Sequence, residues 1–265
     1  MPAEGEEMQS HPSSGDLARH AAELLVQLRE RSPRVHCITN SVAQNFTANV
    51  LLAAGCVPSM TISPEEIGEY VARADALLVN LGTFDRERRE AIRIALAAAG
   101  DNSVSWVLDP VMVDRSTPRA DFARQLVAQG PKAVRLNGAE FTALSGRGDE
   151  IEALVDYARG HACIVARSAA VDFVSDGNRY AAIANGHPLM AKVTAMGCAG
   201  SALIAGCLAV ESDAYIATAA GLLLLGVAGE LAAREVKGPG SFAVAILDTL
   251  HALDGATIIK HARIS

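Results

Sequence analysis

The sequence predicts an α/β fold in which a mostly parallel central sheet carries helices on both faces. Short apolar runs typical of strands alternate with segments of helical periodicity through most of the 265 residues. The strand-like runs lack a polar face, as expected for strands that helices cover on both sides. No linker or shift in composition divides the chain, so we expect residues 16–265 to form a single domain.

The first half of the chain begins with an amphipathic helix, because apolar residues between positions 17 and 28 recur at helical spacing. Gly55 is placed to close a second helix. Ser63-Pro64-Glu65-Glu66 has the pattern of a capping box with Pro at the first helical position, which predicts a helix start. Two further helices are predicted at residues 85–99 and 122–128, and strands at residues 35–39, 57–60, 75–80 and 104–108.

The second half continues this alternation and then becomes helical. Asp176-Gly177-Asn178 is a hairpin signal between strands at 171–175 and 179–184. Helices are expected to fill the chain from Cys198 to about Leu253. The other predicted elements are strands at residues 133–136 and 163–166 and helices at residues 137–144 and 151–159.

Composition excludes several classes of protein. The net charge of −7 and the lack of a basic stripe argue against a nucleic-acid surface. Five cysteines without paired spacing suggest reduced thiols in a cytoplasmic protein, and no zinc-binding spacing is present. Residues 1–15 are acidic and polar, so we expect a disordered lead and no signal peptide. The apolar run 214–229 falls short of the roughly 18 residues of a membrane span and predicts a buried helix.

Polar residues punctuate the ends of the predicted strands, where ligands bind in sheets of this kind. Each such residue singly is weak evidence, but six of these positions in one sequence indicate a site. They are Thr39 with Asn40, Asn80, Asp109, Asn137 with Glu140, Ser168, and the turn at Cys198.

The residues around Asn137 allow two interpretations. Asn137 and Glu140 lie three apart at the first turn of a helix, where they could hold a water or Mg²⁺ beside a phosphate. Alternatively, Glu140 is an N-terminal carboxylate that the helix dipole stabilises. Arg135 at the preceding strand end could clamp a phosphate or be solvated. Asp109, before Pro110, is either a ligand of a metal shell or a turn initiator.

Small residues cluster in the stretch 192–202, which includes Ala195-Met196-Gly197-Cys198 and opens a long apolar run. Such a turn lets backbone N–H groups approach an anion at a helix N-terminus. Cys198 lies inside the turn, where a helix dipole is expected to lower the thiol pKa. The alternative is a tight loop followed by a packing helix.

Read together, these segments resemble the hydroxyethylthiazole kinase family of the ribokinase-like superfamily. The resemblance spans about residues 34 to 254 and includes a phosphate loop at Val193-Thr194 with Gly197-Cys198. The other matching stretches are residues 36–49, Asp109-Pro110-Val111, Arg135 with Asn137 and Glu140, residues 172–177, Asn185-Gly186-His187-Pro188, and Gly238-Pro239-Gly240-Ser241-Phe242.

The resemblance implies a kinase that moves the γ-phosphate of ATP, with Mg²⁺, onto the primary alcohol of 4-methyl-5-(2-hydroxyethyl)thiazole during thiamine salvage. It further implies a homotrimer with sites near subunit interfaces, and Cys198 as the base, at a position where related kinases place an Asp. The implied binding residues are Arg135, Ser168 and Gly197 for the cofactor, Asn40, Gln44 and Ala195 for the substrate, and Asp109, Asn137 and Glu140 for the metal.

This chain also departs from the family pattern. Gln44 stands where the family usually has Met, and Ala195-Met196 replaces Gly-Thr. A glycine-rich stretch has become Met112-Val113-Asp114-Arg115, and Ser168 replaces Thr while keeping the hydroxyl. Two rival functions therefore stay open: a substrate-shifted or non-catalytic ligand-binding relative, and a nucleotide-dependent dehydratase of the same superfamily.

Overall fold

The computed structural model describes residues 14–265, and these residues build one eight-stranded sheet. The strand order is β2-β1-β3-β4-β5-β6-β7-β8, with parallel pairing from β2 to β6 and antiparallel pairing of β7 and β8. The mostly parallel sheet is therefore confirmed. The strands are β1 Arg34–Ile38, β2 Val57–Ser59, β3 Ala76–Asn80, β4 Ser105–Asp109, β5 Ala133–Asn137, β6 Ile164–Ser168, β7 Asp172–Ser175 and β8 Tyr180–Ile183.

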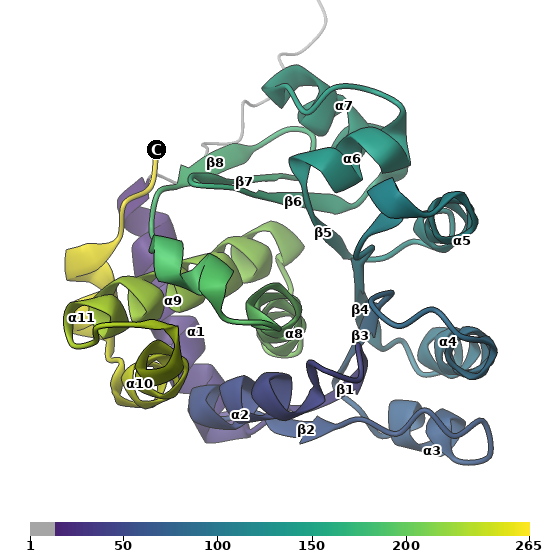
Figure 1. The fold of residues 1–265 in the computed structure, drawn as a ribbon, viewed down its shortest axis with the longest axis horizontal. Helices are drawn as coiled ribbons and strands as arrows, with labels where there is room; N and C mark the ends of the chain where they lie inside the picture. Colours follow the sequence, from purple (N-terminus) through teal and green to yellow (C-terminus); the bar gives the residue numbers. More distant parts are fainter. Residues whose placement is uncertain (1–13) are drawn as a thin grey trace, which may run out of the picture.

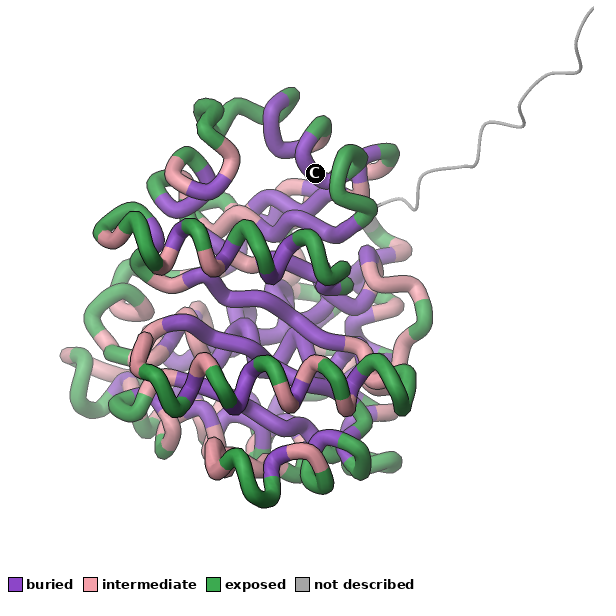
Figure 2. Tube along the Cα trace, turned by 90° about the vertical axis from the view of Figure 1, so that its right-hand side faces the viewer, coloured by how far each residue is buried: buried purple, intermediate pink, exposed green. Residues whose placement is uncertain are grey.

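Helices cover both faces of the sheet and enclose two hydrophobic cores (Figure 1). One face carries α3 Ile67–Ala72, α4 Arg86–Asp101, α5 Thr117–Val127, α6 Gly138–Ser145 and α7 Ile151–His161. The other carries α1 Ser14–Arg31, α2 Gln44–Ala54, α8 Met196–Leu208, α9 Ala214–Arg234, α10 Pro239–Ala252 and α11 Gly255–His261. Figure 2 shows the buried strands in the centre and helices whose outer surfaces are exposed.

The predicted helices and strands are present, most with small shifts of their ends, but α5 starts five residues before the predicted Phe122 and α11 was not predicted. Two further expectations are wrong. The helix predicted from Ser63 begins only at Ile67, and no side chain caps it. Thr61 Oγ1 donates a hydrogen bond to the Glu66 carboxylate, so this carboxylate is not free to complete a capping box. The expected disordered lead is also too long, since Ser14 already starts α1, and residues 1–13 lie outside the described part.

The carboxyl ends of the parallel strands bring the predicted polar residues into register. Asn80 at the end of β3 pairs with Asp109 at the end of β4, and Asn137 at the end of β5 pairs with Ser168 at the end of β6. Two 3₁₀ helices follow strands on this side, at Val113–Arg115 and Pro188–Lys192. The prediction that these strand ends meet is thereby confirmed.

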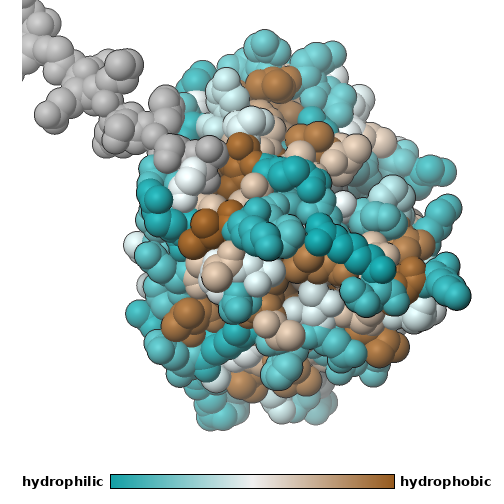
Figure 3. Space-filling model, turned by 90° about the vertical axis from the view of Figure 1, so that its left-hand side faces the viewer, coloured by the Kyte–Doolittle hydropathy of each residue, from teal (hydrophilic) through white to brown (hydrophobic). Residues whose placement is uncertain are grey.

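Helices α8 and α9 lie side by side on one face of the sheet, with α8 packed on β1, β3 and β4 and α9 on β6, β7 and β8. Glycines let the two helices approach closely. A Cβ at Gly221 of α9 would come within 2.8 Å of the Ile204 side chain and 3.0 Å of its backbone. By length and hydropathy α9 could cross a membrane, but 78% of its apolar stretch is buried inside this protein. The predicted buried helix is therefore confirmed. On the surface near α10 and α11, hydrophobic residues are interspersed with hydrophilic ones (Figure 3).

Candidate active site

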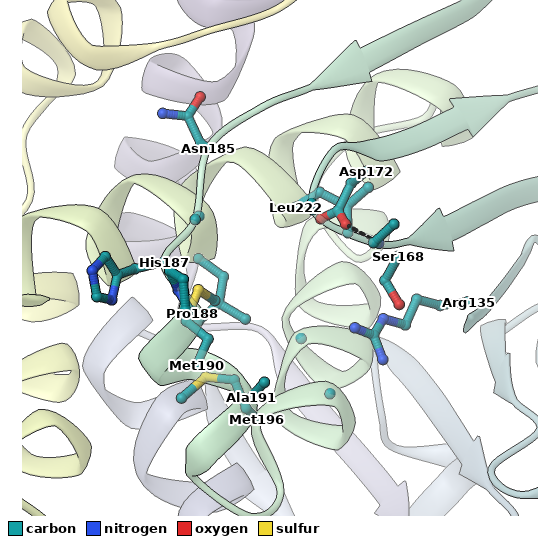
Figure 4. A pocket seen from close by; sticks show the side chains of 17 residues that line it. Arg135, Ser168, Asp172, Asn185, His187, Pro188, Met190, Ala191, Met196 and Leu222 are labelled. Atoms are coloured by element: carbon teal, nitrogen blue, oxygen red, sulfur yellow. Dashed lines mark hydrogen bonds between the residues drawn. The ribbon is translucent and has the colours of Figure 1, made fainter. Parts of the chain in front are cut away.

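The cavity beside α8 brings together the three residues implied to bind the cofactor. It has a volume of about 570 Å³, and Arg135, Ser168 and Gly197 all line it. Arg135 and Ser168 come from β5 and β6, and Gly197 from the first turn of α8. Apolar residues such as Met196 and Leu222 form much of the remaining wall (Figure 4).

Arg135 is the central charge of this site, and its guanidinium is unpartnered. None of the hydrogen bonds or ion pairs among residues 14–265 involves it, and its Nε is buried without a partner. The guanidinium lies so close to α8 that a Cβ at Gly197 would stand 2.6 Å from Arg135 Nη1. A cation beside the positive end of a helix dipole is unfavourable unless an anion joins them. Arg135 also acts electrostatically on the carboxyl groups of Asp109, Glu140 and Asp172, and together with the start of α8 it is a candidate site for an anion.

The turn before α8 has the geometry that an anion loop requires. Ala195 is the N-cap of α8 and adopts a left-handed conformation, with φ 71° and ψ −5°. Its carbonyl accepts from Ala199 N at 2.8 Å, so the helix starts here and its first N–H groups remain available. Met112, in the other stretch where the family has glycine, is also left-handed, with φ 59°. Both departures from glycine thus occupy strained backbone positions.

Burial raises the pKa of the Cys198 thiol to about 12, and the neighbouring carboxylate of Asp109 adds to this rise. Arg135 and a hydrogen bond from Asn80 act in the opposite direction without reversing it. The expectation that the helix N-terminus lowers the pKa of this thiol is therefore wrong, because loss of solvation outweighs the dipole. Cys198 is a neutral thiol at physiological pH.

Asp109 and Glu140 are both buried, and their side chains already hold neighbouring groups. Asp109 Oδ2 accepts from Asn80 Nδ2 and from Ser201 Oγ, each at 2.8 Å. Glu140 accepts from Asn137 N at 2.9 Å and from Met112 N at 2.8 Å. Burial raises the pKa of both carboxyl groups, while Arg135 acts to lower it.

Asn137 completes a capping box with Glu140, because its Oδ1 accepts from Glu140 N at 2.9 Å. Glu140 does lie in the first turn of a helix, as the alternative interpretation held, and the capping box itself was not predicted. Among the residues the structure describes, no three His, Cys, Asp or Glu side chains form a metal cluster. The donors suit Mg²⁺ that keeps several waters and is carried by phosphates, since within the described part of the chain Asp109 Oδ1 accepts no hydrogen bond and each Glu140 oxygen accepts only one.

The residues implied to bind the substrate lie outside the cavity that holds Ser168. Asn40 follows β1, and its Oδ1 accepts from Val42 N at 3.1 Å and from Thr83 Oγ1 at 3.4 Å. Gln44 opens α2 and is half-buried. A Cβ at Gly82 would come within 2.7 Å of Asn40 Cβ and 2.9 Å of Asn80 Oδ1, so this side reaches the Asn80–Asp109 pair.

Two residues that line the cavity were not among the predicted site residues. Asp172 lines the cavity, accepts from Ala169 N at 2.9 Å, and has a pKa raised by burial. Asn185 lines it from the opposite wall, and only its place in a matching stretch could have indicated it.

Comparisons with known proteins identify the family of this chain. The model of the hydroxyethylthiazole kinase family matches residues 25–256. A protein of Agrobacterium fabrum named probable hydroxyethylthiazole kinase is 46% identical over 253 residues, which cover 95% of this chain and 98% of the relative.

Solved structures show the same likeness. The hydroxyethylthiazole kinase protein from Pyrococcus horikoshii superposes with a TM-score of 0.88 at 36% identity, over 92% of this chain and 98% of that one. A ribokinase-like superfamily protein from Enterococcus faecalis has a TM-score of 0.66 at 14% identity, over 96% and 100% of the two chains, which shows a shared fold.

Proposed function

This chain belongs to the hydroxyethylthiazole kinase family, and from that premise we propose that it transfers the γ-phosphoryl group of ATP to the primary alcohol of 4-methyl-5-(2-hydroxyethyl)thiazole. This reaction would serve thiamine salvage. The observation that carries the proposal is the unpartnered guanidinium of Arg135 beside the first turn of α8. Phosphate supplies the anion that this arrangement needs, and the 570 Å³ cavity supplies space for the rest of a nucleotide.

Phosphoryl transfer depends mostly on positioning and on stabilising charge. Arg135 and the free N–H groups at the start of α8 would hold the transferred group while the alcohol oxygen attacks phosphorus. The bond from phosphorus to the bridging oxygen then breaks, ADP leaves, and the hydroxyl proton of the alcohol passes to the Cys198 thiolate, the proposed base, or to water. Ser168 would contribute its hydroxyl at the cavity wall, where it already donates to Leu136 O at 3.2 Å.

Mg²⁺ would offset charge that develops on the phosphates when it is bound there. Asp109 and Glu140 are the residues proposed to hold its waters, with Asn137 fixing the position of Glu140. Asn40, Gln44 and Ala195 are proposed to contact the alcohol. Their place near the Asn80–Asp109 pair supports a substrate site next to the transferred phosphate.

Cys198 is the proposed base, but its chemistry is constrained. A neutral thiol cannot accept a proton, and a pKa raised to about 12 leaves a very small thiolate fraction at pH 7. We therefore expect Cys198 to contribute less to the rate than the groups that bind phosphate.

The proposed function is tested by coupled release of ADP from ATP-Mg²⁺ with the thiazole alcohol as acceptor. Arg135→Gln should lower kcat/KM for ATP by about 10–100-fold, the value of one hydrogen bond to a charged group. Arg93→Gln is the matched control, because it removes a guanidinium from the exposed surface of α4 and should change nothing. Equal activities of the parent and Arg135→Gln would contradict the assignment.

The same assay separates the rival functions. ADP release with another alcohol, and none with the thiazole, would indicate a shifted substrate. Binding of ATP and thiazole without any ADP release would indicate a ligand-binding relative. A dehydratase would consume a hydrated substrate instead of phosphorylating the alcohol.

We also propose that residues 16–265 act as one domain in a cytoplasmic homotrimer. Exposed apolar side chains on neighbouring elements support an interface at α2, β2 and α10, which lie together in Figure 1. These side chains are Val42, Leu52, Val57 and Val244. Light scattering at micromolar concentration tests the trimer, and a monomer would contradict it.

A further inference from the structure

The amide of Asn185 is a buried junction between segments far apart in the chain. Its Nδ2 donates to Glu230 Oε2 of α9 and to His261 O at the end of α11, each at 2.8 Å. Its Oδ1 accepts from Arg263 N at 2.7 Å. Both donors and one acceptor of the amide are thus used within the protein, and the residue is 5% exposed.

The backbone at Asn185 is also held from two sides. A Cβ at Gly226 of α9 would stand only 2.8 Å from Asn185 O, so the helix packs directly on this peptide. Residues 263–265 pair with the edge of β8, with Ala184 N donating to Arg263 O and Ser265 N to Ala182 O, each at 2.9 Å. The chain therefore leaves β8 along a fixed path.

That path leads straight into the wall of the cavity. Gly186, His187 and Pro188 follow Asn185 and line the cavity on the side opposite Arg135 and Ser168. Figure 4 shows the Asn185 amide pointing away from Arg135. The side chain consequently acts on a ligand only through the backbone that it anchors.

We propose that Asn185 is a positioning residue that sets the distance between the wall at residues 186–188 and Arg135, and so the affinity of the cavity for the nucleotide. The inference rests on the proposed function, because it takes the cavity to be the ATP site. Loosening the junction should let the wall move and weaken ATP binding. Acceptor binding and the transfer step should be spared, since Asn40 and the Asn80–Asp109 pair lie outside the cavity lining.

The first test is Asn185→Ala, assayed by steady-state kinetics and by calorimetric titration with ATP-Mg²⁺ in the absence of acceptor. KM and Kd for ATP should rise about tenfold, while kcat at saturating ATP and KM for the thiazole alcohol stay within about twofold of the parent. Asn178→Ala is the matched control, since Asn178 is an exposed amide in the turn at the other end of β8. It should leave all four values unchanged.

A pair of substitutions distinguishes positioning from general damage. Asn185→Asp places a second carboxylate against Glu230 and should raise KM for ATP further. Adding Glu230→Gln restores a donor opposite that carboxylate, so the double variant should regain at least half of the lost ATP affinity. If Asn185 variants fail to fold, Arg263→Ala provides a milder test, because its exposed side chain bonds Ala184 O and Glu230. It should raise KM for ATP about threefold.

The outcomes separate this inference from the proposed function. The role of Asn185 is overturned if Asn185→Ala leaves the affinity for ATP unchanged. It is also overturned if the variant changes kcat and KM for the thiazole alcohol as much as KM for ATP. The proposed function alone is overturned if Asn185→Ala weakens ATP binding as expected but the parent protein does not phosphorylate the thiazole alcohol. A parent that binds no ATP overturns both.

Discussion

Replacing Ala195 by glycine tests whether the anion loop is strained in this chain. Ala195 has φ 71°, where a side chain costs roughly 1–2 kcal/mol. Glycine relieves that cost but gains more freedom in the unfolded chain, which amounts to about 0.5–1 kcal/mol. The difference predicts that Ala195→Gly raises the free energy of unfolding by about 0–1.5 kcal/mol, measured by urea denaturation.

Two alanines serve as controls for this change. Ala162 is exposed and also left-handed, with φ 49°, at the end of α7 and away from the cavity. Ala162→Gly should give a similar gain in stability and no change in activity. Ala199 lies in the first turns of α8 with ordinary helical hydrogen bonding, so Ala199→Gly should lose about 1 kcal/mol. If Ala195→Gly loses stability as Ala199→Gly does, the left-handed conformation of Ala195 is wrong.

The activity arm adds Met196→Thr to Ala195→Gly. Met196 is buried and lines the cavity, so threonine opens space and adds a hydroxyl next to the site of the phosphate. A hydrogen bond to a charged group contributes about 1.5–3 kcal/mol, and about 1.4 kcal/mol is a factor of ten in rate. The double variant should therefore raise kcat/KM for the thiazole alcohol about tenfold or more. A slower double variant would mean that the loop is fitted to another ligand.

Three further substitutions test the electrostatics. Glu140→Gln should lower the free energy of unfolding by about 1–3 kcal/mol, because an amide leaves one of the two backbone N–H groups unpaired. It should also reduce Mg²⁺-dependent turnover, and unchanged turnover would leave Glu140 a purely structural cap. Cys198→Asp should be more active than Cys198→Ser in steady-state assays, since a carboxylate is ionised more readily than a buried thiol; equal rates would remove Cys198 from the chemistry. Burial lowers the pKa of His36 to about 4, so between about pH 4 and 6.5 the folded state binds fewer protons than the unfolded state. The free energy of unfolding should therefore fall by up to about 1.4 kcal/mol for each pH unit as the pH drops from about 6.5 towards 4. Denaturant titrations of parent and His36→Gln across this range should differ in slope, and parallel curves would contradict the neutral burial of His36.

Sequence patterns predicted the sheet and the meeting of its polar strand ends because both follow from local periodicity and from the geometry of parallel strands. Asn80 and Asp109 are examples, since each ends an apolar run and the two then fall in register. The same patterns could not predict the pKa of Cys198. Its position at a helix N-terminus is local, whereas its burial depends on the whole packing of α8.

The junction at Asn185 was invisible in the sequence for a related reason. Its partners His261 and Arg263 lie 76 and 78 residues away, and no periodic pattern links such distant positions. The start of α3 was misplaced because Thr61, outside the four-residue pattern, engages Glu66. In both cases hydrogen bonds to residues outside the local pattern determine the structure.

The close packing of α8 has a consequence for how this protein can change over time. Its first turn faces the ligand, while its later turns are packed on the sheet and against Gly221 of α9. A larger residue at Gly221 would have to displace the Ile204 backbone, and a rigid helix would carry that displacement to Ala195 and Gly197. Substitutions deep in the interior are therefore expected to change the catalytic rate as well as stability, and selection should act on both. New acceptor specificity should arise more readily from the loops after β1 and β4.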